Sequence, residues 1–261
     1  MNQNSISTLY NKSNYLNKSI KYIKNSRIVE YDIKSAGLNI LYELKYIDDD
    51  VYDYISSMPK KERSIYIGKM LRRNPEMNIA LNNGFKHAME MFIRNNNIVD
   101  KDILSIKKDA IYIIDKNIDN LNIQGRLKFV KKKTYDTYIN IMNKEHYINI
   151  SDKILDSKGY TEPIKEHHGK YLLKFLYDII EKDHLTNDSL RIMSDLAIFK
   201  HRLITYDLPI GYYKDIVNDK YLIEMAYTTL MIDNLDDYED KESINYNTNL
   251  KFVLEVINTL I

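Results

Sequence analysis

The chain contains no cysteine and no tryptophan, and it has only seven glycines and four prolines among its 261 residues. Without cysteine, the sequence excludes disulfide bonds, thiolate catalysis and cysteine-type zinc sites. It has no run of 18 apolar residues, so we expect no membrane span and no membrane partner. The first residues, Met1 to Lys12, are polar and lack the apolar segment of a secretory signal. We therefore expect an intracellular protein, in the host cytoplasm if it is viral.

What the chain does contain is typical of a globular protein from an AT-rich genome. Hydrophobic residues make up 44% and charged residues 29%, which suffices for a sizeable core. Asparagine, lysine, isoleucine and 23 tyrosines dominate, and all four have AT-rich codons. We attribute the tyrosines to codon usage, and a bacteriophage or a virus of an AT-rich host fits this composition.

The charge is segregated along the chain, although the net charge is only +1. Residues 1–29 contain five cations and no acid, whereas residues 233–242 form an acidic run. Such separation predicts either a basic surface or two solvated loops. We interpret residues 1–27 as a basic polar arm, with a short helix over Tyr15 to Ile23.

Two stretches place an aspartate at the end of an apolar, β-forming run. Residues 28–33 predict a strand that delivers Asp32, and Ser35 stands where a helix then begins. Residues 103–114 predict a hairpin with Asp109 at its tip. Each acid alone is more typical of a turn or cap than of a metal ligand, and the pair is what favours a site.

The segment between these acids predicts helices. Residues 51–58 and 60–73 form a short helical pair, inserted over about residues 46–73, and residues 76–95 form a longer amphipathic helix. The second helix of the pair is strongly basic. Its cationic side is either a solvated face or an anion-binding face.

After the hairpin the pattern predicts further strands and then helices. Strands are expected over residues 127–134, 138–141 and 146–150, with a turn at residues 156–159. From about residue 163 to 261 the pattern is helical. The fold class is therefore α+β, with a small antiparallel sheet and helices over residues 28–162 followed by an all-helical region.

Two acids on neighbouring strand ends can hold two Mg²⁺ ions, which activate a 3′-hydroxyl and stabilise leaving pyrophosphate. Together with their surroundings, these acids resemble the palm of family B DNA polymerases. Five segments carry the resemblance, in the family's order: Asp32-Ile33-Lys34-Ser35, the Lys60, Ser64 and Gly68 spacing, Lys107-Lys108-Asp109-Ala110, Lys132-Lys133-Thr134-Tyr135, and Lys158-Gly159.

The resemblance implies a role for each matching residue. Asp32 and Asp109 would be the catalytic, Mg²⁺-binding acids. The incoming triphosphate would be held by Lys60, Arg63 and Ser64, and nucleic acid would be gripped by Lys131, Lys132, Lys133, Tyr135 and Lys158. Residues 28–162 would be the palm-like domain and residues 163–261 a thumb-like domain. No exonuclease precedes the palm, and Gly37 replaces the tyrosine that screens the sugar 2′-hydroxyl in the family.

Three functions from different classes remain open at this point. The first is a compact, template-dependent nucleotidyltransferase. The second is a non-catalytic, palm-like protein that binds nucleic acid or a replication or transcription partner, which lysines beside Asp109 favour. The third is a viral structural or host-interaction protein. A metal site at Glu166-His167-His168 is a weaker alternative, because adjacent residues do not face one another on a helix.

Overall fold

The computed structural model describes residues 14–141, 143–159, 177–182, 185, 189–205 and 207. The fold is α+β, as the sequence predicts. Contacts divide the chain into two compact units. The first unit contains residues 1–20 and 25–135, and the second contains residues 21–24 and 136–261. The sequence predicts a boundary near residue 163, whereas the contacts divide the chain after Tyr135, where the strands that follow pair with one another and with Tyr22–Ile23.

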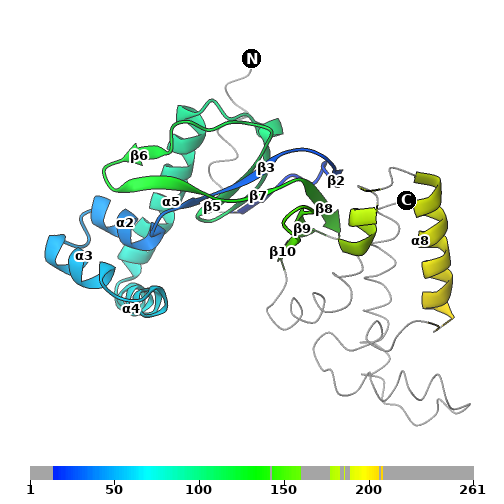
Figure 1. The fold of residues 1–261 in the computed structure, drawn as a ribbon. Helices are drawn as coiled ribbons and strands as arrows, with labels where there is room; N and C mark the ends of the chain where they lie inside the picture. Colours follow the sequence, from blue (N-terminus) through cyan, green and yellow to red (C-terminus); the bar gives the residue numbers. More distant parts are fainter. Residues whose placement is uncertain are drawn as a thin grey trace, which may run out of the picture. The chain divides into compact units, whose positions relative to one another are not determined.

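The first unit is built on a six-stranded antiparallel sheet in the order β1-β4-β5-β3-β7-β6. Strand β3 lies between β5 and β7, so the strand that carries Asp32 has partners on both sides. The bounds of its strands are β1 (Asn14–Leu16), β3 (Ile28–Ile33), β4 (Ile103–Lys107), β5 (Ala110–Ile114), β6 (Asn122–Gln124) and β7 (Leu127–Tyr135). Figure 1 shows β3, β5 and β7 side by side, with the helices of residues 36–73 together at one end of these strands.

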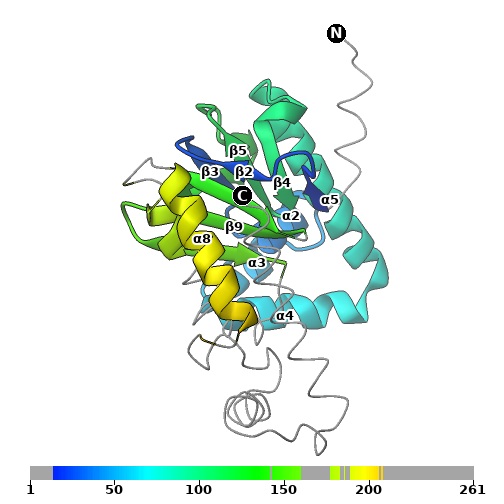
Figure 2. The same ribbon diagram turned by 90° about the vertical axis from the view of Figure 1, so that its right-hand side faces the viewer.

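Four α-helices and a 3₁₀ turn (Asp100–Asp102) connect the strands of the first unit: α2 (Ala36–Glu43), α3 (Asp49–Ser56), α4 (Lys60–Arg73) and α5 (Pro75–Asn95). The Asp48 side chain accepts a hydrogen bond from the Val51 amide and caps α3. Asn74 ends α4 and caps α5 through the Met77 amide, and Figure 2 shows the two helices running in different directions. The predicted helical pair is confirmed.

The core of the first unit lies between the sheet and these helices. Alternate residues of β3 point to opposite faces. Tyr31 packs against Phe92 of α5 with ring centroids 5.7 Å apart, and Phe92 stacks on Phe129 of β7 at 3.9 Å. Glu30 and Asp32 consequently lie on the other face of the sheet from this aromatic cluster.

The second unit is built on a four-stranded antiparallel sheet in the order β10-β9-β8-β2. The bounds of its strands are β2 (Tyr22–Ile23), β8 (Thr137–Ile141), β9 (Lys144–Asn149) and β10 (Ile154–Lys158). Residues 177–182 are helical, and α8 (Ser189–Ile204) is the longer of the helices described in this unit. No helix among the described residues is long and apolar enough to span a lipid bilayer.

Two expectations from the sequence are wrong, and one strand was missed. The segment predicted as a polar arm with a short helix contributes β1 and β2, which pair with β4 and β8. The turn predicted at residues 156–159 lies largely within β10, and β6 was not predicted. β1 and β2 are only three and two residues long, and pairing with β4 and β8, far along the chain, decides them. The helical prediction for residues 163–261 agrees with the described helices; its remaining residues and Glu166-His167-His168 lie outside the described ranges.

Candidate active site

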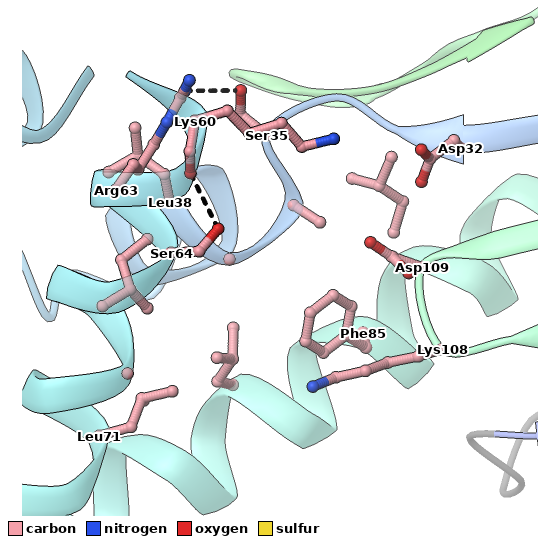
Figure 3. Close-up of a pocket in the computed structure, with 16 residues that line it drawn as sticks. Asp32, Ser35, Leu38, Lys60, Arg63, Ser64, Leu71, Phe85, Lys108 and Asp109 are labelled. Carbon is pink, nitrogen blue, oxygen red and sulfur yellow. Dashed lines mark hydrogen bonds between the residues drawn. The ribbon is translucent and has the colours of Figure 1, made fainter. Parts of the chain in front are cut away.

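Backbone pairing brings the two predicted acids together in the first unit. Asp32 of β3 pairs with Ala110, the first residue of β5, so Asp109 is one residue from that pair. The Ile33 amide also donates a hydrogen bond of 2.9 Å to the Asp109 carbonyl oxygen. Both aspartates line the same cavity, and Figure 3 shows their carboxylates on the same side of it.

The cavity has a volume of about 450 Å³. This is within the usual range for small-molecule sites, roughly 300–1,000 Å³. Its polar lining consists of Asp32, Ser35, Lys60, Arg63, Ser64, Lys108 and Asp109, and its apolar lining includes Leu38, Ile67, Leu71, Leu81 and Phe85. Acids, cations and an apolar floor together suit a ligand with both a polyanionic and an apolar part.

Helix α4 supplies the cations of the wall opposite the acids. Lys60, Arg63 and Ser64 follow one another at helical spacing, so one face of α4 presents all three to the cavity. The Ser64 hydroxyl donates a hydrogen bond of 3.0 Å to the Lys60 carbonyl oxygen of the preceding turn. All three predicted triphosphate-binding residues therefore line the cavity that also contains both acids.

Ser35 directly precedes α2, where the sequence predicts that a helix begins. Its backbone is in the left-handed region, with φ 47°, and its side chain makes no capping hydrogen bond to α2. Instead, Arg63 Nη1 donates a hydrogen bond of 3.1 Å to Ser35 Oγ (Figure 3). A serine with positive φ is uncommon, and here it turns the chain sharply from β3 into α2.

The charge of Asp109 is costly in this position. Burial raises the pKa of the Asp109 carboxyl, and the neighbouring Asp32 carboxylate raises it further. Lys132 and Lys108 act in the opposite direction and favour the ionised form. A divalent cation between the two carboxylates would relieve both the repulsion and the desolvation.

Lys132 is exposed on β7, but its ammonium turns towards these acids. Its ammonium donates a hydrogen bond to Asp32 Oδ2 and lies 3.9 Å from Glu30 Oε1. The hydrogen bond to Asp32 is the main cause that raises the pKa of Lys132. The sequence assigned Lys132 to nucleic-acid contact by its motif, which carries no information on the direction of the side chain.

Tyr135 also differs from its predicted role. It is 1% exposed, and its hydroxyl donates a hydrogen bond of 3.1 Å to Glu30 Oε2. A side chain this deeply buried cannot grip a duplex from the surface of the sheet. Lys131 and Lys133 are exposed on β7, as a nucleic-acid contact requires, while Lys158 ends β10 in the second unit and is half-buried.

Two residues of the site were not assigned from the sequence. Glu30 is a buried acid two positions before Asp32, so the two share one face of β3, and this spacing was the signal available. Lys108 lines the cavity, and its ammonium lies 4.7 Å from the ring centroid of Phe85. A cation over an aromatic face is attracted by the ring quadrupole, which holds Lys108 at the cavity wall.

Two carboxylates suit Mg²⁺ better than a metal ion that needs three or more protein ligands. Within the residues that the structure describes, no three histidine, aspartate or glutamate side chains converge to hold a metal ion. Mg²⁺ is commonly held by one or two carboxylates, with waters and substrate phosphates as the remaining ligands. Asp32 and Asp109 fit this ligand set, and Lys60 and Arg63 lie across the cavity where an anionic ligand would extend.

Comparison with known proteins identifies a family for the chain. A family model described as Bacteriophage PBS1 gene 130 protein matches residues 5–261, which is nearly the whole sequence. A search of curated proteins finds no match. The family match confirms the phage origin that the composition suggested.

Proposed function

We propose that this chain, which belongs to the bacteriophage PBS1 gene 130 protein family, is a compact, polymerase-like nucleotidyltransferase that acts on a nucleic-acid template. One observation supports this proposal above all. Asp32 and Asp109, from segments 77 residues apart (109 − 32), line one cavity whose opposite wall contains Lys60 and Arg63. Acids for metal ions and cations for a triphosphate are the main requirements of phosphoryl transfer.

In the proposed reaction a nucleic-acid 3′-hydroxyl oxygen forms a bond to the α-phosphorus of a nucleoside triphosphate. The bond from that phosphorus to its bridging oxygen breaks, and pyrophosphate leaves with the electron pair. The proton of the 3′-hydroxyl passes to solvent water. Bound Mg²⁺ would supply charge neutralisation at the attacking and leaving oxygens. Asp32 and Asp109 would hold the metal, while Lys60 and Arg63 bind and orient the β- and γ-phosphates.

The nucleic acid would reach the acids along the lysines of β7 and the outer side of α4. Lys131 and Lys133 are exposed on β7, and Lys61, Lys69, Arg72 and Arg73 are exposed on α4. Lysine and arginine rows bind phosphate backbones with little regard to sequence, and the binding weakens steeply with salt. DNA and RNA are both acceptable to such a surface.

A non-catalytic role in nucleic-acid or replication-protein binding is the second candidate, and the Lys132–Asp32 ion pair favours it. An ammonium bonded to Asp32 partly satisfies the charge that a metal ion would otherwise neutralise. In this role the same lysines bind nucleic acid, but Mg²⁺ and Asp32 are dispensable.

Primer extension with a labelled primer-template in Mg²⁺ tests the proposal. We expect incorporation by the wild type and a loss of at least about a thousandfold in Asp32→Ala, since the metal site loses half its carboxylates. Asp53→Ala is the matched control, because Asp53 is an exposed acid on α3 that does not line the cavity. Deoxyribonucleoside and ribonucleoside triphosphates are both supplied, because Gly37 leaves its part of the cavity without a side chain.

Equal incorporation by wild type and Asp32→Ala would contradict the enzymatic proposal. Salt-sensitive nucleic-acid binding that needs neither Mg²⁺ nor Asp32 would then support the non-catalytic role. Absence of nucleic-acid binding even at low salt would point to a structural or host-interaction protein.

A further inference from the structure

We propose that Lys132 is a built-in competitor of the divalent cation for the Asp32 carboxylate. This inference rests on the proposed function, because it concerns the same acids. It adds that metal binding at Asp32 requires the Lys132 ammonium to leave. The site therefore has a low affinity for a metal ion until another anion binds the Lys132 ammonium.

The backbone of β7 is irregular at this one residue. Lys131 pairs with Tyr31 and Lys133 pairs with Glu30, so the register shifts between them and Lys132 has no partner residue on β3. An extra residue of this kind is a β-bulge, which locally redirects side chains and is common beside functional sites. The bulge explains how the exposed Lys132 directs its ammonium to Asp32.

The surroundings of the ammonium are those of a cation site. Lys132 Nζ donates to Asp32 Oδ2 and lies 3.9 Å from Glu30 Oε1. Two carboxylates thus lie at one ammonium, and a metal ion that used Asp32 would meet Lys132 as a like charge.

The lysine is able to leave, because it is much less buried than its partners. The Lys132 side chain is 45% exposed, against 18% for Asp32 and 6% for Glu30. A half-exposed lysine has a flexible four-carbon stem, so its ammonium can move to another anion nearby. A phosphate oxygen of bound nucleic acid or nucleotide is the class of anion that would take the ammonium over.

Titration of the full chain with Mn²⁺ alone, without nucleic acid or nucleotide, tests this competition. Mn²⁺ takes oxygen ligands as Mg²⁺ does, and its free and bound forms are distinguished by electron paramagnetic resonance. We expect Lys132→Met to bind Mn²⁺ at least about tenfold more tightly than the wild type, because a unit charge in contact with Asp32 has been removed. The additional change Asp32→Asn in that variant should abolish the gain.

Two further variants separate charge competition from other effects. Lys132→Arg keeps the charge and should keep the weak binding of the wild type. Lys128→Met removes an exposed charge elsewhere on β7 and should leave Mn²⁺ affinity unchanged. Circular dichroism on each variant verifies that the fold is retained.

Unchanged or weaker Mn²⁺ binding in a folded Lys132→Met variant would overturn the inference, as would an equal gain in Lys128→Met. Neither result depends on catalysis. If the variants show the expected Mn²⁺ affinities but the wild type incorporates no nucleotide, the competition is supported and the proposed enzymatic function is contradicted. If incorporation depends on Asp32 but Lys132→Met does not change Mn²⁺ affinity, only the competition is contradicted.

Discussion

The amide of Ile33 donates a hydrogen bond of 2.9 Å to the carbonyl oxygen of Asp109. This bond joins the end of β3 to the turn between β4 and β5, and it involves only backbone atoms. The distance between the two acid-bearing segments is therefore fixed without help from the acids themselves. Substitutions of either side chain should leave the frame of the site intact, which makes the acids suitable for testing.

Replacing Asp109 by asparagine should stabilise the metal-free protein at neutral pH. The pKa of the Asp109 carboxyl is raised in the folded state, first by burial and then by Asp32. Because this carboxyl has a higher pKa in the folded than in the unfolded protein, its ionisation lowers the stability of the fold. The stability is greatest below the unfolded-state pKa and falls as the pH rises through the folded-state pKa. Asparagine carries no charge and does not suffer that loss.

Thermal unfolding in a chelator, measured across acidic to neutral pH, checks this prediction. The melting temperature of Asp109→Asn should exceed that of the wild type at neutral pH, and the difference should shrink as the solution becomes acidic. Asp53→Asn, an exposed acid on α3, should show no such pattern. A difference that stays constant with pH would mean that the Asp109 charge is not the cause.

Local sequence pattern accounts for the parts of this site that could be predicted. The strand of Asp32, the hairpin of Asp109 and the bounds of α4 follow from short apolar runs, turn residues and helical spacing within one segment each. The direction of Lys132 depends on a bulge between β3 and β7, strands about 100 residues apart in sequence (132 − 32). Tyr135 likewise pairs with Ile28 and donates to Glu30, both far away in the sequence, and neither pairing leaves a local signal.

Gly84 of α5 should be intolerant of alanine because it allows α2 to approach closely. A Cβ at this position would lie 2.3 Å from Ile40 Cγ2. Ile40 is 1% exposed and β-branched, so it cannot move aside cheaply. Overpacking of this kind typically costs about 1–3 kcal/mol, which outweighs the gain of up to about 1 kcal/mol in helix propensity.

Gly68 of α4 is the matched control for that substitution. A Cβ at Gly68 would meet no atom within 4 Å. Gly68→Ala should therefore raise the free energy of unfolding by about 0.5–1 kcal/mol through helix propensity alone. Urea denaturation of both variants gives the comparison, and equal effects at the two positions would show that α2 and α5 are not in close contact at Gly84.

Removing the Tyr135 hydroxyl should destabilise the protein through Glu30. The hydroxyl donates a hydrogen bond of 3.1 Å to Glu30 Oε2, and both residues are buried. Tyr135→Phe leaves a buried carboxylate with one donor fewer, at a cost of about 1–3 kcal/mol. The cost should fall when Glu30 is replaced by glutamine, and a double-mutant cycle by urea denaturation measures this coupling. Additive effects of the two substitutions would contradict it.

Arg63 should contribute to triphosphate binding through its position as well as its charge. Its hydrogen bond of 3.1 Å to Ser35 Oγ holds the guanidinium at the cavity, on the wall opposite Asp32 and Asp109. Arg63→Ala removes the charge, and we expect nucleoside triphosphate binding in Mg²⁺, measured by isothermal titration calorimetry, to weaken about tenfold to a hundredfold. Ser35→Ala keeps the Arg63 charge and removes only the hydrogen bond that holds it, so nucleoside triphosphate affinity should fall several-fold, less than in Arg63→Ala.

Lys61→Ala removes a cation from the exposed side of the same helix and should leave the affinity unchanged. An effect of Lys61→Ala equal to that of Arg63→Ala would mean that α4 acts through its general charge, and the triphosphate would then have to bind outside the cavity.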